Sequence, residues 1–157
     1  MGLDKIDLNI LRELQQDSSL TNQELADRVG LSASPCLRRV KALEESGVID
    51  RSVTLLDEKK LGLKLTAFIQ ISMDRHTPDR FEVFESLLES YPEVKSCHLV
   101  TGQSADYLLE VVVEDMERYQ EFLLGRLTRI AGVTGVHSSF LLRRVINRTS
   151  LPLDHLI

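Results

Sequence analysis

Apolar and polar positions over the first fifty residues alternate with the period of an α-helix. Ile6, Ile10 and Leu14 repeat every four positions, so they share one face of a helix that begins near residue 4. Thr21 precedes Glu24 by three residues, which is the spacing of a capping box at the start of a second helix. The pattern therefore predicts two amphipathic helices joined by a short polar segment.

A third helix is predicted after a tight turn. Gly30 stands where a helix ends with positive φ, and either Ser32 or Ser34, ahead of Pro35, can cap the next helix. This helix has an apolar seam at helical spacing, formed by Cys36, Val40 and Leu43. Helix, glycine turn and capped basic helix is the pattern of a helix-turn-helix, whose second helix enters the major groove of DNA.

The segment after Gly47 changes character. Residues 48–56 are rich in β-formers and predict strand, which would form a two-stranded wing. We therefore expect a winged helix-turn-helix domain over residues 1–56. Residues 57–64 are polar, contain one glycine and are expected to form a linker.

Beyond the linker the apolar period falls to two, which is typical of strands. Strands are predicted over residues 65–73, 94–101, 107–113 and 136–146, with helices between the first and second and between the third and fourth. This βαββαβ order is the ferredoxin-like arrangement. The predicted fold is α+β, with residues 65–157 as the second domain.

Several predicted strands carry apolar residues on both sides. Phe68 stands beside Ile69, and Phe140 and Leu142 flank Leu141. Two helices cover only one sheet face, so the second face is expected to pack against another subunit. The sequence predicts a homodimer at least.

The net charge of the chain is negative, which restricts how it can bind DNA. The net charge is −5, and residues 1–50 hold six Lys and Arg against nine Asp and Glu. DNA contact must therefore come from a local basic patch on an acidic body. The basic residues of this region concentrate at Arg38, Arg39 and Lys41, with Arg51 just beyond.

These residues are the candidate DNA contacts. Ser34, Arg38 and Lys41 share a side of the third helix, and Arg39 lies between that side and the apolar seam. Ser34 and Arg38 are expected to approach base edges, because arginine pairs bidentately with guanine. The expected phosphate contacts are Ser32, Lys41 and Arg51. The alternative is that the charges are solvated and pair with Glu44 and Glu45.

The sequence lacks the motifs of disulfide frameworks, metal sites and catalytic centres. Cys36 and Cys97 suit neither a disulfide framework nor a zinc site and are expected to be small buried residues. The four histidines (His76, His98, His137 and His155) have no metal-ligand spacing, and no phosphate-binding glycine loop or nucleophile elbow is present. No metal, cofactor or catalytic residue is expected. Without a membrane-spanning run or signal-peptide core, a cytoplasmic protein is expected.

Two long segments resemble the Lrp/AsnC, or feast/famine, family of transcriptional regulators. They are LDKIDLNILRELQQDSSLTNQELADRVGLSASPCLRRVKALEESGVI near the N-terminus and CHLVTGQSADYLLEVVVEDMERYQEF in the second domain, with TSLPL near the C-terminus. The resemblance covers nearly the whole chain. It implies a RAM-type second domain, double-stranded operator DNA as a partner, and a homodimer that assembles further, to an octamer.

The resemblance also implies an amino-acid effector held between subunits near one loop. Its residues here are Gly102, Gln103, Ser104, Asp106 and Tyr107. The family spaces this loop as Gly-x-x-Asp-Tyr, and this chain has one residue more, which puts a carried-over effector preference in doubt. Main-chain N–H groups are expected to meet a ligand carboxylate, and Asp106 or carbonyl groups an ammonium. The alternative is a plain β-turn.

Two rival interpretations keep the architecture and change the function. Sirohaem decarboxylases resemble the same family, and His98 and His137 are the candidate catalytic residues for that enzyme interpretation. A second rival is a ligand-binding or chaperone-like assembly protein without DNA contact. The basic, capped third helix favours the regulator over both.

Overall fold

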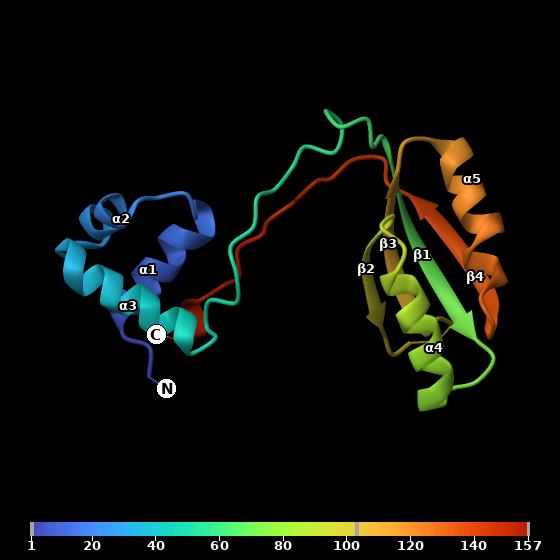
Figure 1. Ribbon diagram of the computed structural model, residues 1–157, viewed down its shortest axis with the longest axis horizontal. Helices are drawn as coiled ribbons and strands as arrows, with labels where there is room; N and C mark the ends of the chain where they lie inside the picture. Colours follow the sequence, from blue (N-terminus) through green and yellow to red (C-terminus); the bar gives the residue numbers. More distant parts are fainter. Residues whose placement is uncertain (1, 103, 157) are drawn as a thin grey trace. The chain divides into compact units, whose positions relative to one another are not determined.

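The computed structural model describes residues 2–102 and 104–156. The chain forms two compact units, one of residues 1–55 with residues 146–157 and the other of residues 56–145 (Figure 1). Each unit has an apolar core of its own.

The N-terminal unit contains the three predicted helices, α1 (Lys5–Gln16), α2 (Asn22–Val29) and α3 (Ala33–Glu45). Asp4 caps α1 in a reciprocal capping box with Asp7, and Thr21 and Glu24 form the predicted box at α2. Gly30 ends α2 with a φ of 73°, a conformation that costs glycine little. The predicted helix-turn-helix is confirmed.

Helix α3 begins after Ser32, whose side chain makes no capping hydrogen bond. Cys36 is fully buried, and burial raises the pKa of its thiol. It packs with Leu43 of α3 and with residues of the two preceding helices, namely Ile10, Leu11, Leu25 and Ala26. Cys36 therefore acts as a small apolar core residue, as its neighbours in the sequence predicted.

The predicted strand over residues 48–56 is absent from the structure, where these residues form no ladder. Val53, Leu55 and Leu56 are exposed. Strand propensity favours an extended backbone but supplies no partner, and an isolated two-stranded hairpin is marginal in water. The segment also lacks the Asn-Gly or Gly-Gly pair that would turn it back on itself.

Residues 146–156 belong to the N-terminal unit, where they pack against α1, and not to the sheet domain, in which the sequence placed them. The Gln15 amide donates to the Leu151 carbonyl at 3.2 Å and accepts from the Leu151 N–H at 2.6 Å. Arg12 pairs with Asp154 at 3.3 Å, and Leu153 packs against the core of the N-terminal unit. These contacts join residues far apart in the chain, so local sequence patterns carry no trace of them.

The second unit is the predicted βαββαβ fold. Its elements in chain order are β1 (Leu65–Met73), α4 (Pro78–Glu89), β2 (Val94–Leu99), β3 (Tyr107–Val113), α5 (Met116–Gly125), a 3-10 turn (Leu127–Arg129) and β4 (Val133–Phe140). The strand order is β2-β3-β1-β4, and all neighbours are antiparallel. The fourth strand ends at Phe140, six residues before the predicted end at residue 146.

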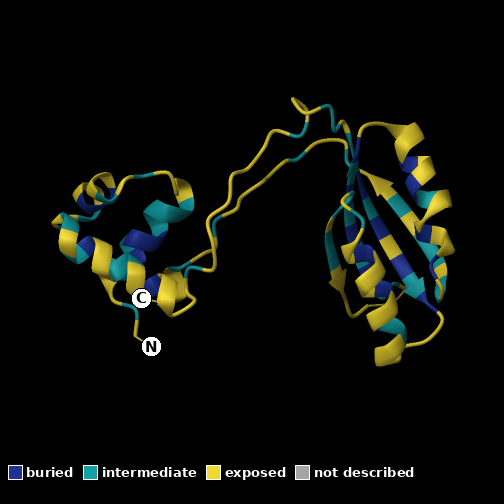
Figure 2. Ribbon diagram, viewed as in Figure 1, coloured by how far each residue is buried: buried dark blue, intermediate teal, exposed yellow. Residues whose placement is uncertain are grey.

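One face of the sheet holds the core. Along β1 and β3 every second residue is buried, an alternation that Figure 2 shows as dark blue against lighter positions. The buried residues pack against α4 through Phe84 and Leu88 and against α5 through Tyr119 and Phe122. Both helices therefore cover the same face.

The opposite, outer face is mixed and less apolar than predicted. Phe140 lies on the helix side, where its ring meets Tyr119 edge-on at 5.1 Å, and Leu142 lies beyond β4 and is 98% exposed. The register places these apolar residues on the outer face: Phe68, Leu108, Val112 and Leu141. Its polar residues include Gln70, His98, Glu110, His137 and Ser139.

An ion network crosses this outer face. Arg144, four residues beyond β4, pairs with Glu110 of β3 at 2.5 Å and lies 3.7 Å from Glu58. Lys95 of β2 pairs with the same Glu58 at 2.8 Å. The chain segments that precede β1 and follow β4 are thereby tied to one another and to the sheet.

Candidate nucleic-acid and effector sites

One side of α3 carries exposed polar and basic side chains. Ser34, Arg38 and Lys41 are exposed and lie at spacings of four and three residues, opposite the buried seam of Cys36 and Leu43. Ser32 and Arg51 are also exposed. Among the described residues no ion pair joins Arg38 or Lys41 to Glu44 or Glu45, so the solvated pairing considered as an alternative does not form.

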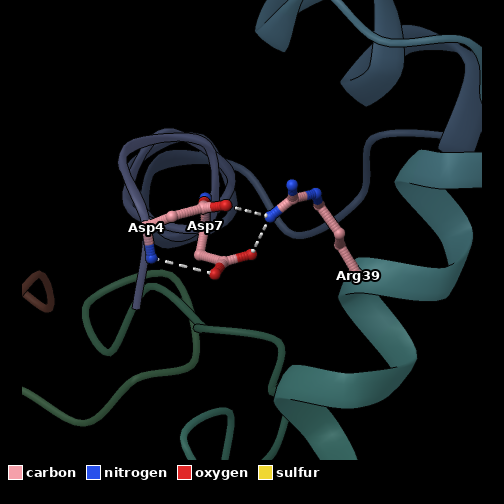
Figure 3. Close-up of polar contacts among 3 residues, drawn as sticks. All are labelled: Asp4, Asp7 and Arg39. Atoms are coloured by element: carbon pink, nitrogen blue, oxygen red, sulfur yellow. Dashed lines mark hydrogen bonds and ion pairs between the residues drawn. The ribbon is translucent and has the colours of Figure 1, made fainter. Parts of the chain in front are cut away.

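Arg39 does not join this surface. Its guanidinium lies against the start of α1, 2.7 Å from Asp4 Oδ2 and 2.8 Å from Asp7 Oδ1 (Figure 3). The Arg39 side chain is 32% exposed and that of Asp7 is 16% exposed. Arg39 therefore holds α3 to α1 within the N-terminal unit.

The same carboxylates cap α1. The Asp4 side chain accepts the Asp7 N–H at 2.8 Å, and this bond, followed by the bond from Arg39, lowers the pKa of Asp4. Asp4 and Asp7 in turn raise the pKa of Arg39. Two aspartates in the first turn of a helix were the only sequence signal of this cluster, because Arg39 lies more than thirty residues away along the chain.

The candidate effector loop is held to the end of β1. Asp106 accepts the Met73 N–H through Oδ2 at 2.7 Å, and its Oδ1 lies 2.9 Å from Nε2 of His76. The Asp106 N–H donates to the Ile71 carbonyl at 2.8 Å. Both carboxylate oxygens thus have partners inside the chain, and Asp106 serves to orient the loop. Sequence reasoning missed His76, which precedes Asp106 by thirty residues.

The rest of the loop is more open. The Ser72 hydroxyl donates to the Ser104 carbonyl at 2.6 Å, a second tie between β1 and the loop. Gly102 is exposed, and a Cβ placed on it meets no described atom within 4 Å. Gln103, predicted as an effector contact, lies outside the described residues.

Tyr107 points away from the loop into the core. It is 1% exposed, and its hydroxyl donates to Glu85 of α4 at 2.6 Å. Burial first, and then Glu85, raises the pKa of Tyr107, so the phenol stays protonated. Tyr107 lines a cavity of about 420 Å³ between α4 and β2 together with Glu89 and Cys97. Burial raises the pKa of Cys97 to about 11, which makes this thiol a poor nucleophile.

The two histidines named for an enzyme lie on different edges of the sheet. His98 of β2 pairs with Leu108, and His137 of β4 pairs with Gln70, so β3 and β1 separate them. Three strand spacings correspond to about 14 Å. Within residues 2–102 and 104–156 no cluster of His, Cys, Asp and Glu is arranged to hold a metal ion.

Family models match both units. Residues 3–50 match the winged helix-turn-helix DNA-binding domain, and residues 66–151 match the Lrp/AsnC ligand-binding domain. The chain belongs to the Lrp/AsnC family. It is a DNA-binding transcriptional regulator of that family, and the enzyme interpretation is set aside.

Relatives with curated functions match over nearly the full length. The Bkd operon transcriptional regulator of Pseudomonas aeruginosa is 44% identical over 151 residues, which cover 96% of this chain and 98% of that protein. The leucine-responsive regulatory protein of Escherichia coli is 42% identical over 143 residues, 91% of this chain and 87% of that protein.

A solved structure from Neisseria meningitidis is similar to this Lrp/AsnC chain throughout. That transcriptional regulator, in complex with L-methionine, is 44% identical, with a TM-score of 0.95 over 99% of this chain and 100% of the other. No helix within the described ranges has the length and apolar character needed to cross a membrane.

The Arg39 cluster leads to a test of its structural role. Arg39→Ala leaves the Asp4 and Asp7 carboxylates without their cation, so we expect the N-terminal unit to melt roughly 2–5 °C lower at pH 7. Arg38→Ala, one residue away and exposed, is the matched control and should leave the melting temperature unchanged. Thermal unfolding followed by circular dichroism, with hydrogen exchange of the α1 amides, measures both.

The pH dependence of this stability has a definite sign. The pKa of Asp4 is lowered in the folded state, so its contribution is present above the unfolded value and is lost as pH falls below about 4. Arg39→Ala removes one cause of that lowering, and its destabilisation relative to the wild type should therefore shrink on acidification. An equal loss of stability at pH 7 and pH 3 would contradict the ion-pair explanation.

Proposed function

We propose that this Lrp/AsnC regulator recognises operator DNA with the exposed side of α3. Ser34 and Arg38, near the helix N-terminus, approach base edges in the major groove, and Ser32, Lys41 and Arg51 contact phosphates. The observation that carries this proposal is the exposed placement of Arg38 and Lys41 on one side of α3, without an ion partner in the described part of the chain, while Arg39 is engaged with α1. We therefore leave Arg39 out of the DNA contacts.

Recognition of an operator is expected to involve two or more copies of the chain. The outer sheet face is not covered by a helix of the same chain and presents Phe68, Leu108, Val112 and Leu141. A second copy packed on this face gives a homodimer with two helix-turn-helix units, which suits a roughly palindromic site. Further assembly, to an octamer, belongs to this proposal, as does a cytoplasmic location.

The effector in this proposal is a small amino acid bound near the loop of residues 102–107. Two similarities support it, the name of the leucine-responsive relative and the L-methionine in the Neisseria meningitidis structure. The loop is tied to β1 through Ser72 and Asp106 while Gly102 and Ser104 remain exposed. Because Asp106 is already engaged, main-chain groups of the loop are the better candidates for binding the ligand.

Coupling between effector and DNA requires that the amino acid bind two states of the assembly with different affinity. The ion network of Arg144, Glu58 and Lys95 offers a physical element for it, because it ties the segments before β1 and after β4 to the sheet. A change in subunit packing on the outer face would alter this network.

Two substitutions test the DNA contacts, one at a proposed base contact and one at a proposed phosphate contact. Arg38→Ala should weaken binding to the preferred site by about 1–3 kcal/mol and relax the preference for guanine. Lys41→Ala should weaken all sites alike and reduce the slope of affinity against salt by about one. Binding to DNA selected by the protein from a random library, measured over a salt series, distinguishes these effects. Unchanged affinity and sequence preference in Arg38→Ala would refute its role.

The dimer is tested by mass in solution. The wild-type chain should scatter as a dimer or larger at micromolar concentration, and Phe68→Asp, which places a charge in the centre of the outer face, should shift it towards monomer. Val83→Asp, at an exposed position on α4, is the matched control and should keep at least the dimer mass. A wild-type monomer would overturn the proposal.

The effector proposal is tested by calorimetry against the twenty amino acids. At least one should give saturable heat, and Ser72→Ala, which frees the Ser104 carbonyl from β1, should weaken its binding several-fold. Ser86→Ala, an exposed serine on α4, is the control and should bind as the wild type does. Absence of heat for every amino acid would count against a ligand-responsive regulator.

A further inference from the structure

One leucine lies at the edge of the proposed DNA-binding side of α3. Leu37 is 42% exposed, and it is not among the residues of the described chain that pack into the core of the N-terminal unit. With Ser34 and Lys41 it forms an i, i+3, i+7 series on the exposed side, and Arg38 follows it directly. Sequence reasoning passed over Leu37 because a leucine in an amphipathic helix is normally assigned to the core.

A single exposed leucine needs no special explanation on an ordinary surface. This one lies among side chains that DNA would cover. At 100° per residue Leu37 is about 100° from Cys36, about 120° from Leu43 and about 60° from Ser34. A helix placed in the major groove with Ser34 and Arg38 towards the bases therefore brings Leu37 against base edges too.

The major groove offers one apolar feature to such a side chain. Each base edge presents hydrogen-bond donors and acceptors, and only thymine adds a C5-methyl group. A leucine facing donors or acceptors leaves them without water or a partner, which costs free energy. Against a thymine methyl the same leucine buries apolar surface on both sides.

We infer that Leu37 is a specificity-determining residue that recognises a thymine methyl beside the guanine contacted by Arg38. This inference rests on the proposed placement of α3 in the major groove. Arg38 and Leu37 then recognise two neighbouring bases by different interactions. Arg38 selects guanine by hydrogen bonds, and Leu37 selects thymine by apolar contact.

The test removes the methyl group from the DNA and the leucine from the protein separately. Full-length protein first selects sites from a random DNA library. Each thymine of the selected half-site is then replaced by deoxyuridine, which lacks only the C5-methyl group. For the wild type, replacement of one particular thymine in each half-site should lower the affinity about fourfold. This is the factor expected when one buried carbon is removed from an apolar contact.

Leu37→Ala should bind the thymine and deoxyuridine sites equally while it still discriminates against loss of the guanine. Leu124→Ala, the same change at an exposed position of α5, is the matched control and should keep the wild-type response. Leu37 lies outside the core of the N-terminal unit, so Leu37→Ala should fold as the wild type does, and its melting curve checks that a loss of response does not come from unfolding. Leu37→Asn should select adenine at this position, since asparagine pairs with adenine.

Two results would overturn the inference. One is a wild-type protein that is insensitive to every deoxyuridine replacement, and the other is a Leu37→Ala protein with the wild-type pattern of sensitivity. A changed mass of Leu37→Ala in light scattering, together with an unchanged methyl response, would assign Leu37 to a contact between copies instead. Failure to select any DNA sequence would refute the proposed operator contacts themselves.

Discussion

The two ion pairs of Arg39 determine which side of α3 is available for DNA. Helix α3 carries basic residues at three positions around its circumference, and the pattern of charges alone does not say which of them face solvent. Asp4 and Asp7 hold Arg39 from the start of α1, and the buried Cys36–Leu43 seam holds the adjoining side. The remaining side, with Ser34, Leu37, Arg38 and Lys41, is the one left to meet a partner. The cluster of Asp4, Asp7 and Arg39 thus caps α1, joins α1 to α3 and fixes which side of α3 faces outward.

A comparable constraint acts in the sheet unit. Two helices after β1 and β3 cover one face and leave the other without a helix of the same unit. The outer face is mixed, with four apolar residues beside the Arg144–Glu110 ion pair. Such a surface suits association between subunits, because it combines apolar contact area with hydrogen-bonding groups that specify register.

Particular elements show how far sequence patterns reach. The capping box at Thr21 and the glycine at residue 30 were visible because each depends on neighbours within four residues, whereas the sequence indicated only that a helix begins near Asp4 and the structure added its capping box. The strand over residues 48–56 and the last six residues of the fourth strand were predicted wrongly, because β-propensity favours an extended chain and a ladder still needs a partner. The His76–Asp106 contact and the packing of residues 146–156 on α1 join distant segments and leave no local pattern.

The sequence by itself determined the presence and order of the helices, the βαββαβ order and the family, since periodicity, caps and long matching segments are properties of neighbouring residues. Only the tertiary structure decided the roles of individual side chains. It assigned Arg39 to α1, turned Tyr107 into the core, engaged Asp106 with β1 and left Leu37 exposed beside Arg38. The physical reason is that a charge or an apolar group acquires its function from the partner it meets. Those partners come from parts of the chain that folding alone brings together.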